Sequence, residues 1–203
     1  VSVVLDDGRL LILGGSRGQP TTSFDVHAFE PASRRIVPVG TLEEGRRFAT
    51  ATRLRDGRVL VVGGGGTLAG APEWELFDPA RGRSVAVGAL AQTRQMHSAT
   101  LLADGRVLVA GGTNRQTAEL YEPATGRWRL LAQTLVHPRE GHSATLLADG
   151  TVLIAGGQGD APHFAERFDP RTERFEALAG PAGEARLMHA AHRGPDGRVT
   201  ILG

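Results

Sequence analysis

Short apolar runs separated by polar turns fill the whole chain. Residues 97–112 read as two apolar strands with a tight turn between them. The second run, 107–110, is small and rich in valine, which is typical of a strand buried on both faces. Asp104-Gly105 predicts a two-residue hairpin turn in which both residues have positive φ. Gly111-Gly112 ends the second strand and indicates a bend or a close approach of another backbone.

The same pattern occurs five times at a nearly constant period. The Asp-Gly pairs begin at residues 7, 56, 104, 149 and 196, and a Gly-Gly pair follows seven residues after each of the first four. A period of this length with only β signals inside it is typical of a repeat protein. We divide the chain into repeats at residues 1–47, 48–95, 96–140, 141–187 and, incomplete, 188–203.

Each complete repeat is predicted to hold four strands. In the third repeat these are residues 97–102, 106–110, 117–121 and 127–131, with an acidic-Pro turn at 122–126 before the last strand. An aromatic residue precedes each such turn, and another stands in the fourth strand of repeats three and four. We expect these aromatic residues in the core: Phe29, Phe77, Tyr121, Trp128, Phe168 and Phe175.

Four-stranded antiparallel sheets repeated around an axis form a β-propeller, in which each sheet buries its faces against its neighbours. The sequence therefore predicts an all-β fold of propeller blades over residues 1–203, as a single domain. Four repeats and the first hairpin of a fifth predict an incomplete propeller in the form of an open arc. We expect the chain to be a piece of a longer polypeptide that holds the remaining blades. The exposed apolar ends of the arc predict poor solubility or self-association.

The Gly-Gly pair, the aromatic residue before an acidic-Pro turn and the aromatic residue in the fourth strand together resemble the kelch repeat. The segments HSATLLADGRVLVAGG and AELYEPATGRW are especially similar to bacterial kelch repeats of the galactose-oxidase-like propeller type. The resemblance covers the whole chain and implies a β-propeller, which in this family usually has six or seven blades. Because kelch propellers include enzymes, sugar-binding proteins and protein-interaction platforms, the resemblance leaves the function open.

The amino-acid composition limits the kinds of binding partner that we expect for this chain. The chain has 23 basic and 22 acidic residues, and every basic residue is arginine. This balance gives no general attraction to nucleic acid or to a membrane surface. There is no cysteine, and no apolar run approaches the length that a membrane span needs. We expect no nucleic-acid partner and no membrane span, and the resemblance favours an exported bacterial protein, in an extracellular, periplasmic or cell-surface location.

Arginine recurs just before the first strand of successive repeats. In the kelch family these loops, with the loops between the second and third strands, lie on one face near the central channel. The resemblance thus implies a partial ring of arginines that binds a carboxylate of an acidic peptide or a sugar acid. The alternative is that each arginine ties adjacent blades together, and that the histidine three residues later caps the strand. The arginines are Arg46, Arg94, Arg139 and Arg186.

The loop between the second and third strands varies in length, which is typical of binding loops on a rigid scaffold. Repeat three offers Asn114, Arg115 and Gln116 there, and repeat one offers Ser16, Arg17, Gln19, Thr21 and Thr22. These side chains suit hydrogen bonding to sugars or peptides.

No catalytic or metal site is predicted. Histidines recur at 97, 142 and 189, but equivalent positions of adjacent blades are usually too far apart to bind one ion. A galactose-oxidase-like copper site needs a Cys, two Tyr and His ligands, and this chain has no Cys and one Tyr. Acids near the proposed binding face are the best candidates for chemistry, without an identifiable acid–base pair: Glu43, Glu44, Glu140 and Glu184.

These observations favour a binding or interaction module that contacts a protein or glycan through its loops, with no cofactor. The alternative is part of a carbohydrate-active enzyme propeller, a sugar oxidase or a mutarotase-like protein, with its catalytic residues outside this chain.

Overall fold

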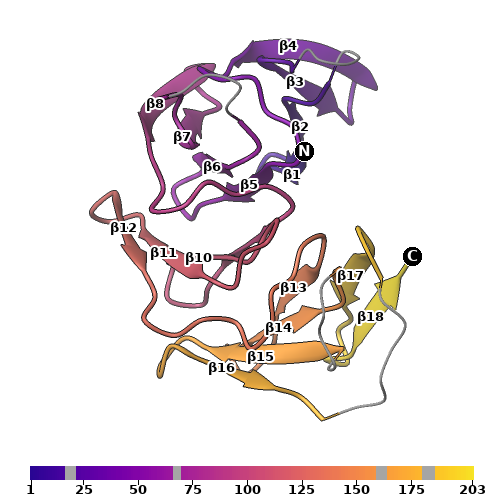
Figure 1. Ribbon diagram of the computed structural model, residues 1–203. Coiled ribbons are helices and arrows are strands. Elements are labelled where there is room, and N and C mark those ends of the chain that lie inside the picture. Colours follow the sequence, from indigo (N-terminus) through magenta and orange to yellow (C-terminus); the bar gives the residue numbers. More distant parts are fainter. Residues whose placement is uncertain (17–21, 66–69, 159–163, 180–185) are drawn as a thin grey trace. The chain divides into compact units, whose positions relative to one another are not determined.

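The computed structural model describes residues 1–16, 22–65, 70–158, 164–179 and 186–203 (Figure 1). Arg17, Gln19, Thr21 and Glu184 lie outside the described residues. The chain forms two compact units, Val1–Gln95 and Met96–Gly203. In the described part of the chain, no helix has the length and apolarity that crossing a membrane requires.

The first unit contains two four-stranded antiparallel meanders. Strands β1 to β4 form the first meander and β5 to β8 the second, and one parallel residue pair, Thr41 with Arg83, joins their last strands. The strands are β1 (Ser2–Val4), β2 (Leu10–Leu13), β3 (Asp25–Glu30), β4 (Arg35–Thr41), β5 (Thr50–Arg53), β6 (Val59–Val62), β7 (Trp74–Asp78) and β8 (Arg83–Gly88).

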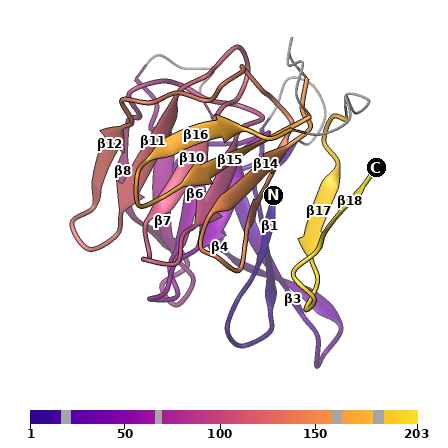
Figure 2. The same ribbon diagram turned by 90° about the horizontal axis from the view of Figure 1, so that it is seen from below.

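The second unit contains two further meanders and a hairpin. Strands β9 to β12 and β13 to β16 pair in chain order, and β17 and β18 form a two-stranded sheet. Figure 2 shows β14, β15 and β16 side by side, with the final hairpin separate from them. The strands are β9 (Ser98–Leu101), β10 (Val107–Ala110), β11 (Ala118–Glu122), β12 (Arg127–Leu130), β13 (Ser143–Leu146), β14 (Val152–Ala155), β15 (Ala165–Asp169), β16 (Arg174–Ala177), β17 (Ala190–Arg193) and β18 (Val199–Leu202).

This architecture confirms the predicted fold class: an all-β chain of four propeller-like blades and the first hairpin of a fifth. In each complete blade we call the strands a to d in chain order. The a–b and c–d turns lie at one end of the strands, the turn end, and the b–c and d–a loops lie at the other, the loop end. Every predicted strand of the third repeat agrees with the observed one to within a residue.

The Asp-Gly hairpins differ from the prediction in their turn type. Only the glycine has positive φ, for example 83° at Gly8 and 94° at Gly105. The Gly8 amide donates to the Leu5 carbonyl at 3.1 Å, and the Leu5 amide donates to the Arg9 carbonyl at 2.9 Å. This is a three-residue loop, a tight turn followed by a glycine bulge, rather than a two-residue turn. The Asp7 carboxylate accepts the Arg9 amide at 3.0 Å, which explains why Asp precedes Gly.

The core lies on the middle strands of each blade. Of the six aromatic residues expected there, three are only partly buried: Phe29, Trp128 and Phe175. All four residues of both β6 and β10 are buried. The aromatic residues before the acidic-Pro turns of blades two, three and four are almost completely buried: Phe77, Tyr121 and Phe168. The rings of Tyr121 and Trp128 lie 5.0 Å apart between centroids, and those of Phe168 and Phe175 lie 4.7 Å apart, close enough to contribute packing energy to the core.

Candidate functional site

The Gly-Gly pair and the recurring arginine form the joint between consecutive blades at the loop end. In each joint the amide of the second glycine donates to the carbonyl of the arginine that enters the next repeat. A Cβ on the first glycine would collide with the next repeat, since it would lie 2.6 Å from the Arg46 carbonyl oxygen at Gly14. This confirms the close approach expected from the sequence. The four hydrogen bonds are Gly15 to Arg46 (2.6 Å), Gly64 to Arg94 (3.0 Å), Gly112 to Arg139 (2.9 Å) and Gly157 to Arg186 (2.7 Å).

The guanidinium of Arg46 is buried and occupied by partners inside the protein. Its Nε donates to Glu75 Oε1 at 2.8 Å, and its Nη1 donates to the Gly63 carbonyl at 2.8 Å. Its Nη2 donates to the Pro72 carbonyl at 2.9 Å and lies 2.7 Å from Glu75 Oε1. The side chain is 1% exposed and its carboxylate partner 0% exposed. Arg46 therefore holds blade two through its side chain and blade one through its carbonyl.

Arg139 repeats this arrangement in the second unit. Its Nε donates to Glu166 Oε1 at 2.7 Å, and its Nη1 donates to the carbonyls of Gly156 at 2.8 Å and Phe164 at 3.1 Å. Each buried carboxylate also holds the incoming d–a loop. Glu75 accepts the amides of Glu43 and Glu44, and Glu166 accepts that of Val136.

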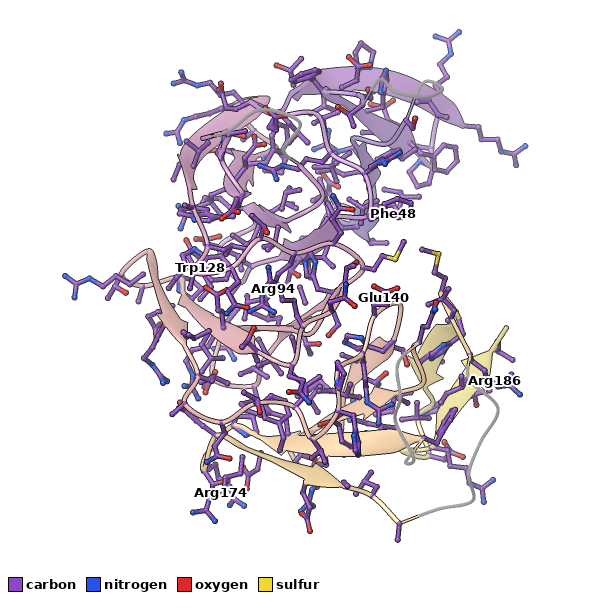
Figure 3. The ribbon with its side chains drawn as sticks, in the orientation of Figure 1. Phe48, Arg94, Trp128, Glu140, Arg174 and Arg186 are labelled. Atoms are coloured by element: carbon purple, nitrogen blue, oxygen red, sulfur yellow. The ribbon has the colours of Figure 1, made fainter. Side chains whose placement is uncertain are left out.

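The other two arginines of the predicted ring differ from each other in exposure. Arg94 is buried, at 3% exposure. Arg186 is exposed, and its Nη1 donates to the Gly203 carbonyl at 2.7 Å (Figure 3). The contacts of Arg46 and Arg139 correspond to the structural alternative, in which arginines tie blades together through carboxylates and carbonyls. Sequence reasoning missed Glu75 and Glu166, although an acidic residue stands at this position of strand c in blades two, three and four.

The histidines also connect blades rather than capping their own strands. His142 Nε2 lies 2.9 Å from Ser98 Oγ, and His189 Nε2 lies 2.8 Å from Ser143 Oγ, so each histidine pairs with a serine of the preceding blade. Burial lowers the pKa of His142 to about 4, and the nearby positive charge of Arg139 acts in the same direction. His142 is therefore neutral at pH 7, and within the described residues no group of His, Cys, Asp and Glu could hold a metal ion.

A residue with left-handed backbone conformation lies just before the first strand of blades two, three and four and of the final hairpin. Phe48, Met96, Gly141 and Met188 have φ between 55° and 61°. The Gly141 amide donates to the Met96 carbonyl and the Met188 amide to the Gly141 carbonyl, each at 2.8 Å. These bonds stabilise a conformation that is otherwise unfavourable for Met. Phe48 and Met188 remain 43% and 54% exposed, so the loop end presents apolar side chains.

The b–c loop of blade three has a fixed backbone and unoccupied side chains. The Gly111 amide donates to the Thr117 carbonyl at 3.1 Å, and the Leu135 amide to the Gln116 carbonyl at 2.8 Å. Asn114 is exposed with φ 55°, and Arg115 is half-buried. Among the described residues, the side chains of both lack hydrogen-bond and ion-pair partners.

Glu140, in the adjacent d–a loop, has a buried carboxylate oxygen. Its Oε2 accepts no hydrogen bond from the described residues, and Figure 3 shows where the side chain lies. Its backbone is fixed, because its amide donates to the Gln158 carbonyl at 3.2 Å and its carbonyl accepts the Gln158 amide at 2.9 Å. A buried carboxylate oxygen without a donor is unfavourable, so this position calls for a donor from water or a ligand.

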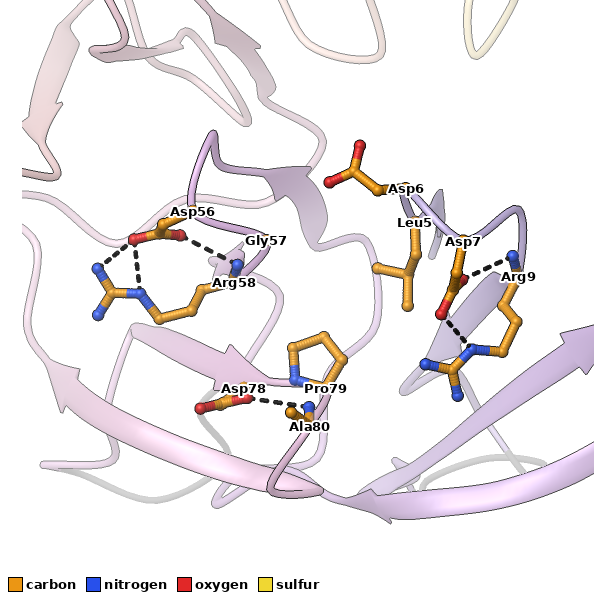
Figure 4. Close-up of a pocket in the computed structure, with 10 residues that line it drawn as sticks. All are labelled: Leu5, Asp6, Asp7, Arg9, Asp56, Gly57, Arg58, Asp78, Pro79 and Ala80. Atoms are coloured by element: carbon orange, nitrogen blue, oxygen red, sulfur yellow. Dashed lines mark hydrogen bonds and ion pairs between the residues drawn. The ribbon is translucent and has the colours of Figure 1, made fainter.

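A separate pocket lies at the turn end of the first unit (Figure 4). Its volume is about 500 Å³, and it is an open pocket lined by the a–b turns of blades one and two and by the c–d turn of blade two. The backbone hydrogen bond from Arg9 lowers the pKa of Asp7, and the side-chain hydrogen bond from Arg58 lowers that of Asp56. The lining residues are Leu5, Asp6, Asp7, Arg9, Asp56, Gly57, Arg58, Asp78, Pro79 and Ala80.

Four-stranded blades linked by glycine–arginine joints define a propeller-like repeat protein. Comparison of the chain with known protein families and with curated proteins finds no match.

Proposed function

We propose that this chain is part of a kelch-type binding module whose loop end contacts a protein or glycan. The observation that carries the proposal is the buried Oε2 of Glu140 at that end of the second unit, which accepts no hydrogen bond from the described residues. A hydroxyl of a sugar or an amide of a peptide is a suitable donor for it, and both ligand classes are rich in such donors.

The surroundings of Glu140 suit recognition. The neighbouring b–c loop offers Asn114 and Arg115, whose side chains have no partner in the described part of the chain. The loop backbones are held by hydrogen bonds, so binding would cost little backbone entropy beyond the ordering of the side chains themselves. Arg115 favours a ligand that carries a carboxylate, such as an acidic peptide or a sugar acid.

The frame behind these groups is rigid for a physical reason. The Arg139–Glu166 pair is almost completely excluded from water and is hydrogen-bonded to two loops. Breaking such a pair leaves a buried charge, so the joint resists displacement. This combination of a fixed frame and unoccupied polar side chains supports binding, and it offers no acid–base pair that would support catalysis.

The test is a screen of the immobilised chain against a glycan array and a peptide library, followed by variants of the loop end. Glu140→Gln and the double variant Asn114→Ala/Arg115→Ala should each weaken a true ligand roughly tenfold or more, as expected for losing a hydrogen bond to a charged group. Glu122→Gln, at the turn end of the same blade, is the matched control and should bind normally. Ligands that bind all of these variants equally would contradict the proposal.

A further inference from the structure

The turn end differs between the two units at one equivalent position. In the second unit, Arg106 follows the Asp-Gly turn of blade three and reaches the c–d turn of blade four. Its Nη1 donates to Glu173 Oε1 at 3.0 Å and its Nη2 to the Pro170 carbonyl at 3.0 Å. Arg129 also donates to Glu173 Oε1, at 2.5 Å. One carboxylate therefore connects two blades by accepting hydrogen bonds from two arginines of the preceding blade.

In the first unit the corresponding carboxylate is missing. Arg9 corresponds to Arg106, and Gly82 corresponds to Glu173, since each is the fifth residue of its c–d turn and has positive φ, 64° and 56°. Gly82 has no side chain, and a Cβ there would lie 2.3 Å from the Val39 carbonyl oxygen. A side chain is therefore excluded, and the pocket lies where Arg9 faces the c–d turn.

Arg9 is left with unused donors. Its Nε donates to Asp7 Oδ2 at 2.8 Å, and this ion pair is its only one among the described residues. The two Nη groups have no hydrogen-bond partner within the described part of the chain (Figure 4). Such a guanidinium has two parallel N–H groups that match the two oxygens of a carboxylate.

We propose that the turn-end pocket of the first unit binds a carboxylate carried on a short aliphatic chain, in the position that Glu173 fills in the second unit. The ligand carboxylate pairs with the Nη groups of Arg9, and its aliphatic part lies on Leu5 and Pro79. The acidic lining does not leave this site with uncompensated negative charge, because each carboxylate already has an arginine: Asp6 with Arg53, Asp7 with Arg9, Asp56 with Arg58, and Asp78 with Arg81.

The first test uses butyrate, with its neutral isostere butyramide as the control ligand, in ligand-observed saturation-transfer NMR of the full chain at pH 7. We expect saturable binding of butyrate and none of butyramide. Arg9→Gln should weaken butyrate binding roughly tenfold or more. Arg198→Gln is the matched control, because Arg198 occupies the same hairpin position in blade five and lies outside the pocket. Equal binding of both ligands, or butyrate binding that Arg9→Gln leaves unchanged, would overturn the proposal.

A second variant tests the comparison on which the inference depends. Glu173→Gly removes the internal carboxylate and leaves the Nη1 group of Arg106 without this acceptor, as the Nη groups of Arg9 are in the first unit. We expect the number of butyrate sites per chain to rise from one to two. An unchanged number would show that the missing carboxylate does not create a site.

The source of the carboxylate is distinguished by a third ligand, acetyl-glutamate methylamide, which presents the same carboxylate as a side chain. Tighter binding of this compound than of butyrate identifies an acidic side chain of a protein segment as the natural ligand. Tighter binding of butyrate identifies a free organic acid. Failure of the blocked glutamate and butyrate alike to bind would overturn the proposal, without affecting the proposal for the loop end of the second unit.

Discussion

The two units use the same joint at the loop end and different joints at the turn end. At the loop end, Arg46–Glu75 and Arg139–Glu166 make equivalent contacts, including the hydrogen bond from Nη1 to a glycine carbonyl at 2.8 Å in both. At the turn end, the first unit brings backbones together at Gly82, whereas the second uses the carboxylate of Glu173. The buried arginine–glutamate joint at the loop end is therefore common to both units. The outer joint, at the turn end, differs between them.

A second difference lies next to the buried joint. The second unit places His142 and His189 against serines of the preceding blades, whereas the first unit has Ala49 at this position. A Cβ on Gly156 would lie 2.5 Å from His189 Cε1, so the glycine leaves room for the ring. In the first unit Ala49 packs against the apolar cluster. The same backbone therefore supports either a polar or an apolar contact.

Breaking the buried joint should have the largest effect, and an equal one in both units. Arg46→Leu leaves Glu75 buried without its cation, and Arg139→Leu does the same to Glu166, so each should lose about 3–5 kcal/mol of stability. Urea unfolding followed by circular dichroism measures the loss. Arg127→Leu, an exposed arginine, is the control and should change stability by less than about 0.5 kcal/mol. A clear difference between the two joint variants would break the equivalence of the units.

Lowering the pH should reduce the free energy of unfolding of the second unit, because His142 is buried in its neutral form. The pKa of His142 is about 4 when folded and near 6.5 when unfolded, so only the unfolded chain gains a proton between these values. The stability present above pH 6.5 should therefore fall by about 3 kcal/mol as the pH drops to 4. Urea unfolding at about pH 7, 6, 5 and 4 measures this loss of stability. His142→Gln should remove this part of the pH dependence. An unchanged slope in the variant would show that His142 is not responsible.

The tight backbone contact of the first unit should be visible in a matched pair of glycine substitutions. Gly82 and Gly126 occupy the same turn position with φ of 64° and 68°, but a Cβ on Gly126 would have no atom within 4 Å. Gly126→Ala should cost only the left-handed conformation, about 1–2 kcal/mol. Gly82→Ala should cost about 1–3 kcal/mol more, because the Val39 carbonyl must move. Thermal unfolding compares the two, and equal losses would contradict the close contact.

The ionic bridge of the second unit should contribute least. Glu173→Gly removes a partly exposed carboxylate that forms ion pairs with two arginines, which costs up to about 1 kcal/mol of stability. It also relieves the left-handed conformation of Glu173, which recovers about as much. We expect a net change within about 1 kcal/mol of zero in urea unfolding. A loss comparable with that of Arg139→Leu would show that the outer joint is as important as the buried one.

Much of the fold could be predicted because its signals are local. Valine-rich runs such as 107–110, the acidic-Pro turns and the Asp-Gly pairs each specify a strand or a turn from a few neighbouring residues. The hairpin type was predicted wrongly, because Asp-Gly occurs in two-residue turns and in three-residue loops alike. The hydrogen bond from Gly8 to Leu5 distinguishes the two, and it depends on one residue of register between the strands.

The site was less accessible to sequence reasoning. The pattern located Arg46 and Arg139 and showed that they recur, but it gave two possible roles for their guanidinium groups. Glu75 lies 29 residues after Arg46 in the sequence, and Glu166 lies 27 residues after Arg139. Only the pairing of the strands places these carboxylates against the arginines. The unused donors of Arg9 depend similarly on Gly82, which is distant in sequence.

The repeat, the strands and the small residues at the joints follow from the amino-acid sequence alone, because periodicity, turn chemistry and the absence of a Cβ act over a few residues. The folded structure determines which polar groups have hydrogen-bond partners inside the protein and which remain available to bind a ligand. Arg46 is occupied by Glu75, while Arg9 keeps free donors and Glu140 keeps a buried oxygen without a donor in the described residues. The physical reason is that a hydrogen bond needs its partner within about 3 Å, and the folded arrangement of distant segments sets that distance.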